Sequence, residues 1–147
     1  MMTMNLAENI CTVACGLFFL IGLLTGVWKY AGIRRSPDFR APRYVSVSHI
    51  TALMYSFACL VLLELSRQSP LPDAVEAGIV IAIISFFALA QGSYLLHGLL
   101  RDTDNQLARP HRLATRTWPS WTITLFMLTL ILVEVGGFLI LFLAAVW

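Results

Sequence analysis

Four long apolar stretches make up most of this 147-residue chain, and they restrict its fold more than any other feature. They cover residues 10–28, 45–63, 77–100 and 117–147, and short charged connections separate them. A helix of about 20 residues crosses the hydrocarbon of a bilayer, and backbone amides in lipid must bond within their own segment. The sequence therefore predicts an all-α integral membrane protein in which four transmembrane helices form an up-down bundle.

The composition leaves no room for a second, soluble domain. Charged residues make up 12% of the chain, about half the share in an ordinary soluble domain. We expect one domain over residues 1–147, with helices at about 6–30, 45–65, 74–100 and 117–146.

Basic residues predict the orientation of the bundle. The 29–43 connection holds five Lys and Arg residues and the 101–116 connection holds four, whereas the outer connection holds only Arg67. Because short loops rich in Lys and Arg stay in the cytoplasm, we expect loops 29–43 and 101–116 there and both termini outside, in the periplasm or a lumen. No Lys or Arg precedes the first stretch, so it is expected to be a retained helix rather than a cleaved signal peptide. The membrane we expect is the inner membrane of a bacterial cell.

Small residues in the first stretch predict close helix packing. Gly22 and Gly26 are spaced so that two helix backbones can approach closely, either within the bundle or in an oligomer. Cys11, Cys15 and Cys59 do not have the spacing of metal ligands, so no metal site is expected. Their expected role is that of small buried apolar side chains.

Polar side chains within the membrane are costly, which makes each one a candidate for function. Most of them occupy one face of the second stretch and one face of the third. The candidate ligand-binding residues are His49, Thr51, Tyr55, Gln91, Tyr94, His97 and Arg101. Since the two helices run antiparallel, His49 and His97 should lie at similar depth. The pattern predicts a polar site in the inner leaflet, beneath the basic loops.

Two other functions would use intramembrane polar residues differently. His49 and His97 could supply both axial ligands of a haem, although hydrogen bonds to neighbouring groups explain them as readily. Glu134, beside Gly136 and Gly137, could relay protons or bind a cation in an ion-conducting or proton-conducting bundle. A lone carboxyl group serves equally as a hydrogen-bond partner in helix packing.

Three short segments resemble the MAPEG family, the membrane-associated proteins in eicosanoid and glutathione metabolism. Residues 28–35 (WKYAGIRR) are similar to the basic exit of the family's first helix. Residues 48–55 (SHITALMY) resemble its stretch in which Ala-His is followed by Asn and then Glu-Tyr, and residues 94–99 (YLLHGL) its Arg-Leu-Leu-His segment. The resemblance implies a homotrimer with a cleft between subunits near the cytoplasmic side. It also implies a glutathione-dependent transferase or peroxidase, whose catalytic Arg near the fourth helix would correspond to Arg112 or Arg116.

The chain departs from this family in the second helix. Val47, Thr51 and Met54 stand where the family has Arg, Asn and Glu, while Tyr55 matches. The charged family residues anchor glutathione, and apolar replacements cannot. We therefore expect a diverged MAPEG-like protein whose site takes an amphipathic or lipid-like ligand, with membrane lipids as partners and no nucleic acid. The alternative is a non-catalytic accessory subunit of a larger membrane complex, since the helices are almost uniformly apolar.

Overall fold

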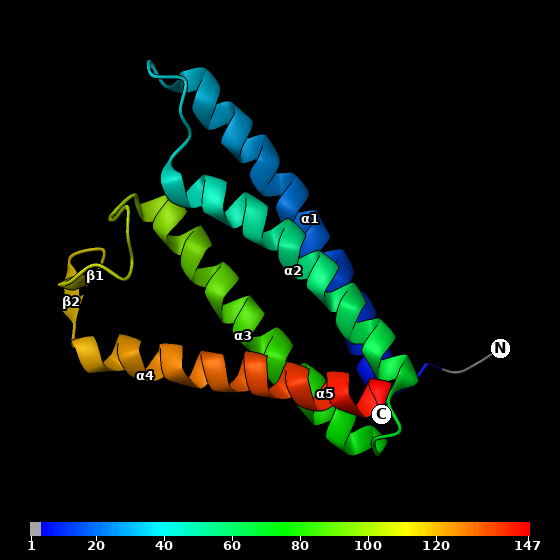
Figure 1. The fold of residues 1–147 in the computed structure, drawn as a ribbon. Helices are drawn as coiled ribbons and strands as arrows, with labels where there is room; N and C mark the ends of the chain where they lie inside the picture. The colour runs from blue at the N-terminus through cyan, green and yellow to red at the C-terminus, as the bar shows by residue number, and fades with distance from the viewer. Residues whose placement is uncertain (1–3) are drawn as a thin grey trace.

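The computed structural model describes residues 4–147 and confirms the all-α membrane fold (Figure 1). Four helices in the described part are long and apolar enough to cross a membrane. The elements in order are α1 (Leu6–Arg35), α2 (Arg43–Gln68), α3 (Asp73–Leu100), β1 (His111–Leu113), β2 (Arg116–Trp118), α4 (Ser120–Ile131), the π-helical turn η1 (Leu132–Gly136) and α5 (Gly137–Val146). The fourth spanning helix thus consists of α4, η1 and α5.

The helix ends differ from the predicted bounds where polar residues continue or interrupt a helix. Helix α1 extends to Arg35, beyond its apolar stretch, and ends before Ser36 and Pro37. Helix α4 begins only at Ser120, because residues 116–118 pair with residues 111–113 in an antiparallel hairpin. This hairpin was not predicted from the sequence.

Three helices form the body of the bundle, and the fourth diverges from it. Helices α1, α2 and α3 pack along one another, and α5 contacts α2 and α3. Figure 1 shows α4 leaving α3 toward the hairpin. We call the end with the hairpin the hairpin end, and the opposite end, where α1 begins and α5 ends, the terminal end. None of the α4 residues, all of which the structure describes, is buried. By contrast, Leu141 of α5 is fully buried in the core beside Ile83 and Val80.

Gly22 and Gly26 bring α1 and α2 together within the bundle. A Cβ atom on Gly22 would lie 2.5 Å from Cδ2 of Leu53, and one on Gly26 would lie 2.9 Å from Cε1 of His49. Nδ1 of His49 is 2.8 Å from the carbonyl oxygen of Gly22 and donates a hydrogen bond to it. The two glycines therefore form the surface on which the α2 side chains rest.

Candidate functional site

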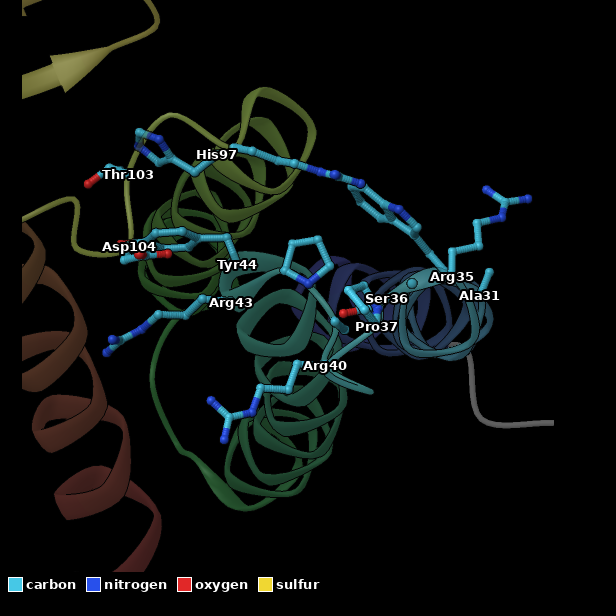
Figure 2. Close-up of a pocket in the computed structure, with 15 residues that line it drawn as sticks. Ala31, Arg35, Ser36, Pro37, Arg40, Arg43, Tyr44, His97, Thr103 and Asp104 are labelled. Carbon is cyan, nitrogen blue, oxygen red and sulfur yellow. The ribbon is translucent and has the colours of Figure 1, made fainter.

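A polar cavity of about 490 Å³ opens at the hairpin end, between the last turn of α1, the 36–42 connection, the first turn of α2 and the end of α3. We call it the arginine pocket. Its charged and aromatic lining residues are Arg35, Arg40, Arg43, Arg101, Asp104, Trp28, Tyr44 and His97. Figure 2 shows Tyr44 and His97 side by side on one wall, with Arg35 on the opposite side.

Helix ends place the arginines around this pocket. Arg35 ends α1, and Arg43 lies in the first turn of α2, directly after Pro42. Arg101 caps α3 in a left-handed conformation (φ 50°), with its amide bonded to the carbonyl of His97. Gly98 lets the end of α3 come close to both other helices, since a Cβ there would lie 3.3 Å from side-chain atoms of Trp28 and of Val45. The three helix ends thus meet at one cavity.

A hydrogen-bonded pair holds the wall formed by α3. His97 Nδ1 donates to Oδ1 of Asp102 at 2.7 Å, and Oδ2 of Asp102 accepts from the amide of Ala114 at 2.6 Å. Burial alone would raise the pKa of Asp102, but these bonds and the nearby imidazole lower it below its ordinary value. Asp102 is therefore charged near neutral pH. It fixes the His97 ring and ties the hairpin to the end of α3.

Tyr44 connects the same wall to the loop that follows α3. Its ring centroid lies 5.1 Å from that of His97 and 6.1 Å from that of Tyr94. The Tyr44 hydroxyl accepts a hydrogen bond from the amide of Gln106 at 2.6 Å, and Gln106 accepts one from the hydroxyl of Ser93 at 2.8 Å. These contacts hold residues 101–106 against the start of α2.

The arginine pocket carries excess positive charge. Among the described residues, Arg67 forms an ion pair with Glu64, and Asp102 bonds to His97, a contact that is an ion pair only when His97 is protonated. The four arginines of the pocket are exposed and make no ion pair with a described carboxylate. Although Asp104 also lines the cavity, its single charge leaves the surroundings cationic. This arrangement can hold an anionic group.

Two of the residues predicted from the sequence, His97 and Arg101, lie in the arginine pocket, and Tyr94 stacks beside it on Tyr44. The pocket also contains five residues that were not predicted from the sequence as site residues: Trp28, Arg35, Arg40, Arg43 and Tyr44. The available signal was the concentration of arginines in the 29–43 connection, which was interpreted as a determinant of orientation.

The other predicted ligand-binding residues lie deeper in the bundle, where their side chains contact a neighbouring helix or their own helix. They are His49, Thr51, Tyr55 and Gln91. Gln91 is buried and donates its Nε2 to the Ser48 hydroxyl at 2.7 Å. The Tyr55 ring stacks on that of Phe87 with centroids 4.3 Å apart, and the Thr51 hydroxyl bonds to a carbonyl of its own helix. None of these four residues lines the arginine pocket. The structure therefore does not bring all the predicted residues into one cavity.

The two histidines proposed as haem ligands have different surroundings. His97 lines the arginine pocket, whereas His49 packs against Gly26 of α1. No group of three or more His, Cys, Asp or Glu side chains in the described part of the chain is arranged to hold a metal ion.

The two arginines predicted as catalytic both lie in the hairpin. Arg116 is exposed on β2 and does not line the arginine pocket. The side chain of Arg112 lies outside the part that the structure describes, so its role stays a prediction.

Comparison with protein families, curated proteins and solved structures finds no match to this chain. The resemblance to the MAPEG family therefore stays a prediction.

Proposed function

We propose that this protein binds an anionic amphiphile, such as an acidic phospholipid, with the headgroup in the arginine pocket. The observation that carries this proposal is the set of exposed arginines around one cavity, without carboxylate partners among the described residues. Guanidinium groups bind phosphate through paired hydrogen bonds, and their stems can lie along apolar surface.

The surroundings of the pocket suit an amphiphile better than a free anion. Exposed apolar side chains of the spanning helices, including Val27 and Leu99, lie within one or two residues of the lining residues Trp28 and Arg101. An acyl chain can follow such a surface while its headgroup stays at the helix ends. If loops 29–43 and 101–116 are cytoplasmic as we propose, the pocket faces the leaflet whose anionic lipids attract basic segments.

Glutathione fits this chain less well, which is why we propose a diverged MAPEG-like protein. At the positions where that family anchors glutathione, Thr51 bonds to its own helix and Met54 lies in an apolar groove. Neither side chain offers a charge to an end of the tripeptide. Lipid binding, rather than thiol chemistry, is accordingly the primary activity we propose.

The test is lipid retention by the purified full chain, measured by native mass spectrometry with phosphatidylglycerol and phosphatidylcholine. We expect phosphatidylglycerol to be retained preferentially and Arg101→Gln or Arg43→Gln to weaken its binding about fivefold, since a surface Arg contributes about 1 kcal/mol toward an anionic headgroup. The matched control is Arg67→Gln, an exposed arginine in the last turn of α2 at the terminal end, which should leave binding unchanged. Equal retention of both lipids would refute the proposal, and strong thermal stabilisation by millimolar glutathione would favour the glutathione-dependent enzyme instead.

One observation also favours an accessory role. Helix α4 is strongly apolar, has no buried residue and diverges from its own bundle. Another polypeptide could cover it, either a second copy of this chain, as in a homotrimer, or a larger membrane partner. The composition and stoichiometry of the purified complex distinguish these two assemblies.

A further inference from the structure

A second cavity lies between α2, α3 and the fourth spanning helix, and it differs in character from the arginine pocket. Its volume is about 590 Å³, within the usual range for sites of drug-sized ligands. Its walls are apolar side chains, among them Phe57 of α2, Phe87 of α3 and Phe138 of α5. Glu134 is the one charged side chain among the described residues that line it. We call this cavity the Glu134 groove.

Glu134 sits close to the middle of the membrane span. It lies 14 residues after Ser120 and 12 before Val146, or about 21 and 18 Å along the helix axis. It belongs to the π-helical turn η1, and such turns are often associated with functional sites. The turn follows α4, which lies apart from the bundle, and precedes Gly137, whose missing side chain lets α5 approach Ile83 of α3.

The Glu134 carboxyl group lacks a partner of its own. Oε1 is shut off from solvent and receives no hydrogen bond from any residue that the structure describes. Burying a carboxyl group at this depth of the membrane costs free energy unless the group bonds to a partner or a ligand. A second copy of this chain cannot supply a Lys or Arg at this depth, because the four apolar stretches carry no charged residue other than Glu134.

We propose that the Glu134 groove binds a lipophilic organic cation, with Glu134 as counter-ion and the phenyl rings as walls. A cation attracts both a carboxylate and the face of an aromatic ring, and the apolar lining requires the rest of the ligand to be apolar. A lipid acyl chain would fill the groove but would leave the Glu134 oxygen without a partner. The cation satisfies both the charge and the shape of the site.

The test measures binding of tetraphenylphosphonium to the purified full chain in a neutral detergent by equilibrium dialysis. The wild-type protein should bind this cation saturably, and Glu134→Gln, which keeps the shape of the side chain, should weaken binding at least tenfold. Glu64→Gln is the matched control, because Glu64 is an exposed carboxylate at the terminal end and should not affect binding. Tetraphenylborate, an anion of nearly the same shape, should bind at least tenfold more weakly than the cation.

A second variant keeps the test decisive if Glu134→Gln fails to fold. Phe57 is 62% exposed, so Phe57→Leu disturbs little packing while it removes one aromatic wall. It should weaken binding of tetraphenylphosphonium several-fold without lowering the melting temperature. The proposal is overturned by absence of saturable cation binding, by equal binding of the two ions, or by variants in this groove that bind like the wild type. Equal binding of both ions would identify the groove as a site for lipid chains.

Discussion

The contact between α1 and α2 gives the most direct test of the structure, through the substitution Gly26→Ala. The added methyl group would lie 2.9 Å from Cε1 and 3.2 Å from Nδ1 of His49, so the imidazole must move. That movement breaks its 2.8 Å hydrogen bond to the carbonyl of Gly22. Overpacking costs about 1–3 kcal/mol, and an interhelical hydrogen bond in a membrane contributes about 0.6 kcal/mol.

Gly16→Ala is the matched control on the same helix. Nothing lies within 4 Å of a Cβ at Gly16. Both variants therefore gain the same helix propensity, and only Gly26→Ala introduces a steric clash with α2. The free energy of unfolding, measured by titration with a denaturing detergent in mixed micelles, should be lower for Gly26→Ala than for Gly16→Ala by about 1.5–3.5 kcal/mol. Equal stabilities would refute the close approach of the two helices.

A double-mutant cycle identifies His49 as the group that is displaced. His49→Ala alone loses the hydrogen bond and leaves a space, whereas in the Gly26→Ala background the new methyl group occupies part of that space. His49→Ala should therefore destabilise the double variant less than it destabilises the wild type, with a coupling energy of about 0.5–3 kcal/mol. Additive effects would show that the two residues do not touch.

Three further predictions concern the loops and the assembly. Asp102→Asn should lower the melting temperature near neutral pH. The pKa of Asp102 in the folded protein lies below its ordinary value of 3.8. The charged carboxylate therefore stabilises the folded protein fully above pH 3.8, and this stabilisation is lost as the pH falls through the lower folded pKa. The melting curves of the two proteins should accordingly converge in acid. A reporter fused after Trp147 should be active outside the cytoplasm and one inserted at residues 102–109 inside it, and the reverse pattern would move the arginine pocket to the other side of the membrane. Native mass measurement in mild detergent should give a homotrimer, whereas a strict monomer or a fixed complex with another protein would contradict the MAPEG-like assembly.

The spanning helices could be predicted because apolar length alone determines them. The end of the first helix could not, since the segment from Lys29 to Arg35 lies outside the apolar stretch and yet continues α1 as a helix. The hairpin also gives little signal, because strands of three residues are too short to show an alternating pattern. Its position depends on tertiary contacts such as the bond from the Ala114 amide to Asp102.

The candidate site was only partly predictable for the same reason. Polar residues on one face of α3 predicted that His97 and Arg101 would lie together, and both line the arginine pocket. Tyr44 was missed because it joins the site through the Gln106 amide, 62 positions away along the chain. His49 was predicted to face a ligand, but it faces Gly22 and Gly26. This contact could not be predicted, because the sequence alone does not show which helix packs against the glycines of α1.

The fourth spanning helix links the two proposed sites but leaves them chemically separate. Its first residue follows the hairpin, which Asp102 holds beside the arginine pocket, and its π-helical turn supplies Glu134. The two cavities share no lining residue and have opposite charge. Arg101→Gln should therefore leave binding of tetraphenylphosphonium unchanged, and Glu134→Gln should leave retention of phosphatidylglycerol unchanged. If either substitution weakens binding of both ligands while the protein stays folded, the two sites must be coupled through a joint shift of α4 and η1. The divergence of α4 from the bundle would then be part of how the protein responds to its ligands.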